Sequence, residues 1–192
     1  MQLDNQQEQW QTEQSDRVLA RVAGQDHAAF TLLYQRYIKR VYAYLYSRVG
    51  NVQDAEDLTT ITFMAALAQI QQYRGEGSFA AWLLGIAYHK SIDLHRKTRA
   101  SAPLAVASEF PDPTPSPDEM VLQQVQREEL ARALHSLTPE RAEAIALRFF
   151  GELSNAEVAT VMGKGEAAVK MLVHRGLQEL RIRLGVREER VR

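Results

Sequence analysis

The chain of 192 residues contains no cysteine. This absence excludes a disulfide framework, a thiol nucleophile and a zinc site with cysteine ligands. No stretch approaches the roughly 18 consecutive apolar residues that a membrane-spanning helix needs, so we expect no membrane insertion. The N-terminus is polar and rich in glutamine, with neither a basic start nor an apolar core. We therefore expect no secretory signal and predict a cytoplasmic protein.

Positive charge is missing from the middle of the chain. No Lys or Arg lies between Ala100 and Gln126, a stretch that carries four acidic residues. Residues 164–192 carry eight bases against four acids, and residues 86–100 carry four bases against one acid. Two basic segments around an acidic middle indicate local contact with a polyanion. Solvated helix faces are the alternative explanation.

Proline is also scarce outside one stretch, because five of the six prolines lie between residues 103 and 117. Closely spaced prolines cannot continue a helix, so this stretch predicts an extended linker. The predicted divisions are a polar N-terminal segment with a first short helix (1–24), a first domain (25–99), the acidic linker (100–118), a second domain (119–185) and a basic tail (186–192).

No alternating strand pattern of useful length is present, and the first domain reads as helix throughout. Apolar residues recur at three- and four-residue spacing from Phe30 to Leu45. Asn51 is a candidate N-cap for a second helix that reaches about Gln72, and Ser78 for a third long helix. We predict an all-α fold of two small helical domains.

The second domain has clear helix boundaries. Residues 120–137 are expected to form one helix, and Thr138 followed by proline starts the next. Ser154 and Glu157 have the spacing of a capping box. That short helix is predicted to stop at Gly163, with a longer helix after it to about residue 184.

The most specific motif is the spacing of Ala159, Gly163 and Val169. A small residue at a helix crossing, a turn glycine and a buried β-branched residue are typical of a helix-turn-helix, whose second helix enters a major groove. An ordinary pair of packed helices is the alternative. Further core positions are Val158, Met162 and Leu172, and the predicted exposed face carries Glu166, Lys170, His174, Arg175 and Gln178.

Two other clusters carry possible binding chemistry. Aromatic residues alternate with bases between residues 73 and 97, which suits single-stranded DNA, although Phe79 and Trp82 could instead belong to the core. Three carboxylates lie near the start of the second helix, where the helix dipole alone would favour them. These carboxylates are Asp54, Glu56 and Asp57.

Four segments, in order, resemble the extracytoplasmic-function (ECF) sigma factors of the sigma-70 family, in the compact type with only regions 2 and 4. They are residues 30–37, residues 54–58 with Phe63, residues 73–96 and residues 137–183. The resemblance implies a non-catalytic transcription initiation factor without a cofactor or metal. The implied partners are bacterial core RNA polymerase (β′ clamp helices and β flap), promoter DNA and an anti-sigma factor.

The resemblance also implies roles for particular residues. Asp54, Glu56 and Asp57 would dock on the clamp helices. The melted −10 strand would meet Tyr73, Arg74, Phe79, His89, Arg96 and Lys97. The −35 element would meet Lys164, Glu166, Lys170, Met171, His174 and Arg175. The linker would follow the basic RNA-exit path of the polymerase, or act as a spacer.

Four positions depart from the usual pattern of the family. His89 replaces an Asn near the flipped −10 base, and Gly85 replaces an Arg. Met171 and Leu172 replace a Ser-Arg pair in the recognition helix. We therefore expect that the −10 and −35 sequences preferred by this chain cannot be taken over from the family pattern.

Two other functional classes deserve comparison. His89, Asp93 and His95 lie close along one predicted helix and suggest a metal site, but His95 is offset and no phosphate loop or nucleophile motif accompanies them. A stand-alone DNA-binding regulator would use the helix-turn-helix and leave the first domain unexplained. Dependence on polymerase separates this regulator from a sigma factor.

Overall fold

The computed structural model describes residues 15–100 and 130–184, apart from the side chains of residues 97–100. Several predicted segments lie outside these residues: the N-terminal segment up to residue 14, the linker beyond residue 100, most of the helix expected over 120–137, and the tail. Every regular element in the described ranges is helical, which confirms the all-α prediction. No helix within them is long and apolar enough to cross a membrane.

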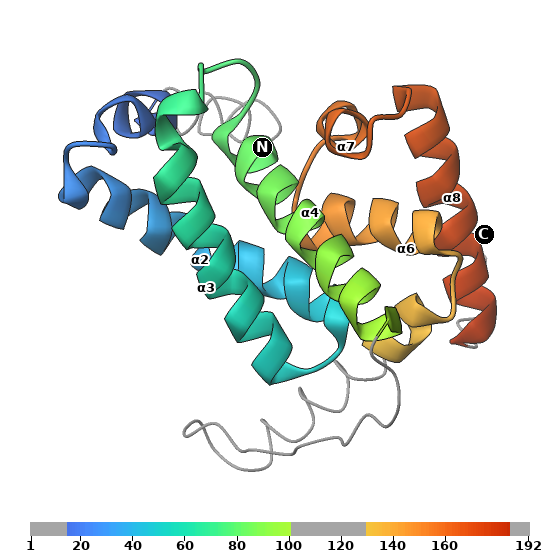
Figure 1. Ribbon diagram of the computed structural model, residues 1–192. Helices are drawn as coiled ribbons and strands as arrows, with labels where there is room; N and C mark the ends of the chain where they lie inside the picture. Colours follow the sequence, from blue (N-terminus) through green and yellow to red (C-terminus); the bar gives the residue numbers. More distant parts are fainter. Residues whose placement is uncertain (1–14, 101–129, 185–192) are drawn as a thin grey trace, which may run out of the picture.

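Three long helices build the first half of the molecule. They are α2 (His27–Val49), α3 (Val52–Gln69) and α4 (Phe79–Ala100), with a 3-10 turn, η1 (Ile70–Gln72), after α3. Helical turns over residues 15–22 precede them, held to α2 because the buried Asp16 accepts hydrogen bonds from Arg36 and Tyr37. In Figure 1, α2 and α3 lie side by side, and α4 runs between them and the second half.

The predicted helix boundaries in the first half are correct. The Asn51 side chain accepts a hydrogen bond from the Asp54 amide at 2.8 Å, as an N-cap does. Ser78 Oγ accepts one from the Ala81 amide at 3.2 Å and so caps α4. Gly50 ends α2 in the left-handed region, with φ at 75°. These signals act over three or four residues, which is why they can be read from sequence.

The second half consists of shorter helices. Residues 130–135 are helical, followed by α6 (Pro139–Ile145) with proline at its first turn. The next segment, η2 (Ala146–Phe150), widens to π-helical geometry, with the Gly151 amide donating to the Ala146 carbonyl at 2.9 Å. The last two helices are α7 (Asn155–Met162) and α8 (Glu166–Arg183).

The two halves pack directly on each other. Helix α2 contacts η2, and α4 contacts α7, so a single apolar cluster contains buried residues from both halves. Leu33 and Phe79 belong to this cluster from the first half, and Leu147, Leu153 and Val158 from the second. The −10 and −35 segments implied by the resemblance are therefore neighbours in this fold, as the central α4 in Figure 1 illustrates.

Candidate nucleic-acid interface

The turn between α7 and α8 has the geometry of a helix-turn-helix. Ser154 and Glu157 form a complete capping box at the start of α7. Gly163 adopts the left-handed conformation, φ 63°, and its amide donates to carbonyls of the last turn of α7. Any side chain with a Cβ would be strained there, which explains the glycine. Gly165 then caps α8 in an extended conformation.

The packing of α8 on α7 follows the predicted spacing. Val158 and Val169 are fully buried, and Ala159 is almost so. Met162 and Leu172, also predicted as core residues, are only half-buried. Helix α8 further packs on α6 at Gly176, where a Cβ would lie 2.6 Å from the Ile145 methyl group. The side of α8 away from these contacts is exposed.

That exposed face carries the side chains predicted to meet the −35 element. Lys170, Met171, His174 and Arg175 are all exposed, as is Gln178. Met171 is 50% exposed and adds an apolar side chain to this face. The face therefore offers donors and one apolar contact on a helix free to enter a groove.

Two of the bases that were predicted to meet the −35 element form surface ion pairs. Lys170 Nζ lies 2.8 Å from Glu166 Oε1, one turn earlier on α8. Lys164 Nζ, in the turn, lies 2.7 Å from Glu140 Oε1 on α6. Exposed ion pairs contribute at most about 1 kcal/mol, so phosphate groups can compete for both lysines.

The loop between η1 and α4 is a compact turn with an aromatic anchor. Gly75 and Gly77 both have positive φ, 76° and 74°. The Tyr73 hydroxyl donates to the Gly77 carbonyl at 3.1 Å, and its ring contacts Phe79 and Trp82 with centroids 5.5 Å apart in each case. Tyr73 is thus held in place but half-exposed.

Phe79 differs from its predicted role. It is 1% exposed and packs against Tyr37, Tyr73 and Trp82, so its ring has no free face for a base. The core explanation is therefore the correct one for Phe79, and Trp82 is half-buried against the same cluster. Phe79 supports Tyr73 rather than contacting a ligand itself.

The remaining −10 candidates lie along the exposed side of this region. Arg74, His89 and Arg96 are exposed, and the Arg96 guanidinium is 4.0 Å from the Asp93 carboxylate. The Lys97 side chain lies outside the described residues. A Cβ at Gly85 would meet no atom within 4 Å, so no packing contact requires glycine at this departure from the family pattern. In the described part of the chain no three metal-ligating side chains come together.

The three carboxylates at the start of α3 have different surroundings. Asp54 is tied to the helix cap, because Asn51 Nδ2 donates to its carboxylate at 2.7 Å. Glu56 and Asp57 are exposed, and Asp57 accepts a hydrogen bond from Gln53 at 3.2 Å. Two of the three carboxylates are therefore presented to a partner, while the third also stabilises the helix.

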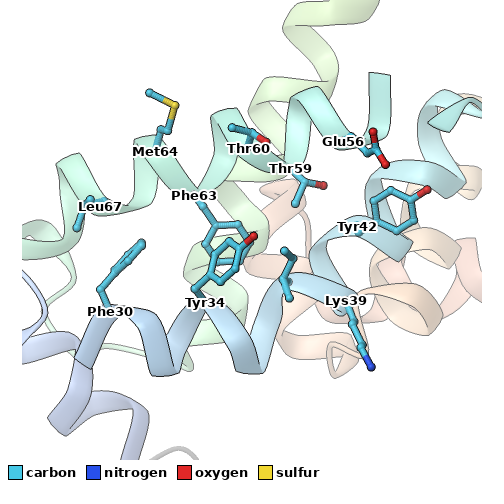
Figure 2. A pocket seen from close by; sticks show the side chains of 11 residues that line it. Phe30, Tyr34, Lys39, Tyr42, Glu56, Thr59, Thr60, Phe63, Met64 and Leu67 are labelled. Carbon is cyan, nitrogen blue, oxygen red and sulfur yellow. The ribbon is translucent and has the colours of Figure 1, made fainter. Parts of the chain in front are cut away.

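A groove between α2 and α3 was not predicted from the sequence. Its volume is about 800 Å³. In Figure 2 the rings of Phe30, Tyr34 and Phe63 fill its floor, and Glu56 lies at one end. The rings of Tyr34 and Phe63 meet edge to face, 4.8 Å between centroids. Met64 is 67% exposed on its rim.

One signal in the sequence could have revealed this groove. Helix α3 has more apolar residues than one buried face can hold: Leu58, Phe63 and Ala66 are buried, whereas Met64 and Leu67, which line the groove, are 67% and 44% exposed. Exposed apolar residues on consecutive turns mark an interaction surface.

Both halves of the chain match models of known protein families. Residues 33–101 match the model of "Sigma-70 region 2", and residues 127–180 match that of "Sigma-70, region 4". The ECF RNA polymerase sigma factor BldN of Streptomyces coelicolor is 37% identical over 155 residues, covering 79% of this chain and 59% of BldN. The RNA polymerase sigma factor YlaC of Bacillus subtilis is 30% identical, covering 78% of this chain and 88% of YlaC.

A solved structure is also similar over most of the chain. CnrH, determined in complex with the cytosolic domain of CnrY, superposes with a TM-score of 0.70 at 25% identity, covering 89% of this chain and 97% of CnrH. The match to BldN leaves two-fifths of that protein unmatched, whereas those to YlaC and CnrH include nearly their whole lengths.

Proposed function

Because the chain belongs to the ECF sigma factors of the sigma-70 family, we propose that it directs core RNA polymerase to specific promoters. In this role α8 reads the −35 element in the major groove, and residues 73–97 capture the melted −10 strand. The chain catalyses nothing itself and uses no cofactor. It acts in the cytoplasm, where polymerase and chromosome meet.

The single observation that carries the −35 assignment is the exposed face of α8 on a helix-turn-helix. The left-handed turn at Gly163 and the buried Val169 fix how α8 projects. Lys170 and Arg175 can donate to guanine or phosphate, and Met171 can contact a thymine methyl group. Lys164, Glu166 and His174 complete the set that we assign to this element.

The −10 assignment rests on Tyr73 and its neighbours. A half-exposed ring, anchored by the Gly77 carbonyl and backed by Phe79, can stack on an unpaired base. Arg74, His89 and Arg96 supply exposed donors nearby, and Lys97 extends the basic track in sequence. Since extrusion of a base costs a few kcal/mol of stacking, a rigid ring helps to offset that loss.

We assign the docking surface for the β′ clamp helices to the groove of α2 and α3 together with Glu56 and Asp57. The groove is largely apolar, and its two charged lining residues are Glu56 and Lys39, so it suits an amphipathic helix that places a base beside Glu56. Opposite charges would favour association rate and register. Region 4 would meet the β flap, and an anti-sigma factor would be a further partner. The similar protein CnrH was determined in complex with the cytosolic domain of CnrY.

In-vitro transcription tests the proposal. Purified protein is added to bacterial core polymerase on a library of promoter fragments, and the 5′ ends of transcripts are sequenced. Discrete starts that share −35 and −10 elements support a sigma factor. Absence of specific starts, with duplex binding by the protein alone, would point to the stand-alone regulator.

Paired variants test the −35 residues. Lys170→Ala with Arg175→Ala should reduce specific initiation at least tenfold, given about 1–3 kcal/mol for each base-reading pair. Arg17→Ala with Arg21→Ala removes the same charge from exposed positions before α2 and should leave initiation unchanged. Equal effects of the two pairs would contradict the assignment to α8.

Charge reversal tests the clamp surface. Glu56→Lys and Asp57→Lys, made singly, should each weaken binding to core polymerase several-fold without loss of helicity. Asp54→Lys is less informative because it also removes part of the α3 cap. Glu140→Lys, an exposed acid on α6, serves as the control. Unchanged binding by both α3 variants would refute this docking surface.

A further inference from the structure

A second hollow lies between α2 and η2, apart from the groove of α2 and α3. Its volume is about 480 Å³, which is within the range of small-molecule sites. We propose that it binds a nucleoside phosphate, with the phosphates held by bases of α2 and the heterocyclic ring stacked on an aromatic side chain of η2. We call it the α2–η2 pocket. Its lining includes Arg36, Lys39 and Arg40 from α2, and Phe149, Phe150 and Glu152 from η2 and the segment after it.

Three bases of α2 line one side of this pocket. Lys39 and Arg40 follow Arg36 by three and four residues, so the three side chains are neighbours on one side of the helix. Like charges at this spacing repel one another, and an anion placed among them removes that cost. Two acids meet these bases in the free chain: Asp16 accepts a hydrogen bond from Arg36, and Glu152 Oε2 lies 3.7 Å from Arg40 Nε.

Donors for a phosphate remain available on this side. Lys39, which also lines the groove of α2 and α3, is exposed and makes no ion pair with any described residue. In Figure 2 its ammonium group points away from α3. Arg40 donates its Nε–H to the Gly151 carbonyl at 2.6 Å, and no hydrogen bond between described residues uses its Nη groups. Hydrogen bonds from charged donors to phosphate are among the strong ones in proteins, so Lys39 and Arg40 together suit a phosphate.

The other side of the pocket supplies a stacking surface. Phe149 is 51% exposed, and the guanidinium carbon of Arg148 lies 5.6 Å from the centre of its ring. Aromatic rings stack on any nucleobase, and an arginine beside the ring adds a cation–π contribution. Inorganic phosphate would use the bases of α2 and leave Phe149 without a contact. A ligand that carries both a phosphate and a planar ring uses both sides of the pocket, which is why we assign a nucleoside phosphate.

Two unusual backbone conformations border the pocket. Phe149 and Phe150 belong to the π-helical segment η2, a geometry found frequently at functional sites. Glu152 has a φ of 48° and is the one non-glycine residue with positive φ in the described ranges. Such a conformation is costly and persists where the surrounding structure requires it. The Glu152 carboxylate lies beside Arg40, where an anionic ligand would displace it.

Calorimetric titration of the purified full chain tests the proposal. ADP and GDP serve as probes, and pyrophosphate and adenosine represent their separate parts. We expect saturable one-to-one binding of at least one diphosphate, at least about fivefold tighter than that of pyrophosphate, and weaker binding as the salt concentration rises. No saturable binding of either diphosphate would overturn the proposal. Equal affinity for ADP, GDP and pyrophosphate would also overturn it, because the pocket would then be a simple anion site.

Variants of exposed residues locate the bound nucleotide. Phe149→Ala should weaken binding of the diphosphate at least about fivefold and leave binding of pyrophosphate unchanged, because only the base stacks on the ring. Leu32→Ala is the matched control, since Leu32 on α2 is also 51% exposed and does not line the pocket. Lys39→Ala should weaken binding of both probes several-fold, whereas Arg181→Ala removes an exposed base of α8 and should not. Circular dichroism verifies that each variant is folded.

The acid at the pocket gives a change in the opposite direction. Glu152→Gln removes the carboxylate that meets Arg40, so it should tighten binding of the diphosphate and of pyrophosphate by up to about fivefold. Glu140→Gln removes an exposed acid of α6 and should leave both affinities unchanged. Unchanged affinity in Phe149→Ala, Lys39→Ala and Glu152→Gln together would place the nucleotide elsewhere and overturn the proposal.

A short single-stranded oligodeoxynucleotide separates this pocket from a DNA contact. If Phe149→Ala and Lys39→Ala weaken binding of the oligonucleotide but not of the diphosphate, the pocket contacts DNA and the proposal is wrong. Neither titration depends on promoter-specific initiation. Binding of the diphosphate at these residues without specific transcription starts would leave the pocket standing and defeat only the proposed function.

Discussion

The two halves differ in how much of their hydrophobic core is formed by their own residues alone. The first half surrounds large buried side chains, among them Tyr44, Leu33 and Phe79. The second half has a separate apolar cluster of a few smaller residues. Most of its other buried apolar side chains belong to the cluster of the first half. The helix-turn-helix is thus stabilised partly by its contacts with the first half. Separation of the halves would therefore expose apolar surface.

The largest expected effect comes from a cavity in the shared cluster. Leu147→Ala removes a fully buried side chain of the second half and should lower the free energy of unfolding by about 2–5 kcal/mol. Trp82 of the first half reports the transition by fluorescence in denaturant, with Trp10→Phe as background. A shared core predicts that the Trp82 transition moves with the mutation.

Ile182→Ala provides the control, since Ile182 is 81% exposed and should change stability by less than about 0.5 kcal/mol. If Leu147→Ala leaves the midpoint of the Trp82 fluorescence transition unchanged, the two cores are independent and the comparison above is wrong.

The turn glycine of the second half gives the next largest effect. Gly163→Ala places a Cβ at φ 63° and should cost about 1–2 kcal/mol. Gly165→Ala, at φ −75° with no atom within 4 Å of the added Cβ, should cost clearly less. Thermal unfolding measures both. Equal losses would show that the left-handed turn is not what requires glycine.

Helix caps allow a finer test within the second half. Ser154→Ala removes a capping-box hydroxyl and should cost about 1 kcal/mol. Thr138 occupies the same position before α6 but makes no side-chain cap bond, so Thr138→Ala should be nearly neutral. Urea unfolding of both variants compares them, and a larger loss for Thr138→Ala would contradict the geometry.

The smallest effect is a pH dependence of stability at the buried contact between α2 and α6, where Arg48 Nε lies 3.0 Å from Glu143 Oε2. Burial raises the pKa of Glu143 above its ordinary value of 4.5, against the lowering effects of Arg48 and Tyr44. The folded protein therefore binds the proton more tightly than the unfolded chain, in which this carboxyl is solvated. The resulting stabilisation is complete below about 4.5 and is lost as pH rises through the raised pKa.

The contribution of Glu143 to the free energy of unfolding should thus increase slightly as pH falls from 8 to 5, and Glu143→Gln should remove it, as measured by urea unfolding of both proteins. Tyr44 and Arg48 on α2 and Tyr88 on α4 also face this carboxyl. His135 contacts Arg48, so both proteins should carry His135→Gln. A gain in stability of the protein with Glu143 over the Glu143→Gln variant as pH increases would contradict this sign.

Sequence reasoning succeeded where the determinants are local. The caps at Asn51 and Ser154 and the stop at Gly163 depend on contacts within a few residues. It could not foresee that Glu143, between two alanines on a short helix, is buried against a residue 95 positions earlier. The same limit hid the groove and left the place of Phe79 open, because burial depends on which helix lies opposite.

The double use of Glu157 has a consequence for exchanging halves between related proteins. Its carboxylate accepts hydrogen bonds from an N-cap residue of each half, Ser78 and Ser154, so a hybrid that joins a foreign second half to this first half inherits a contact it was not matched to. A hybrid that lacks an acid at position 157 or 143 would leave Ser78 or Arg48 facing an unsuitable neighbour. Compatibility of such hybrids is therefore decided at these two carboxylates as well as at the promoter.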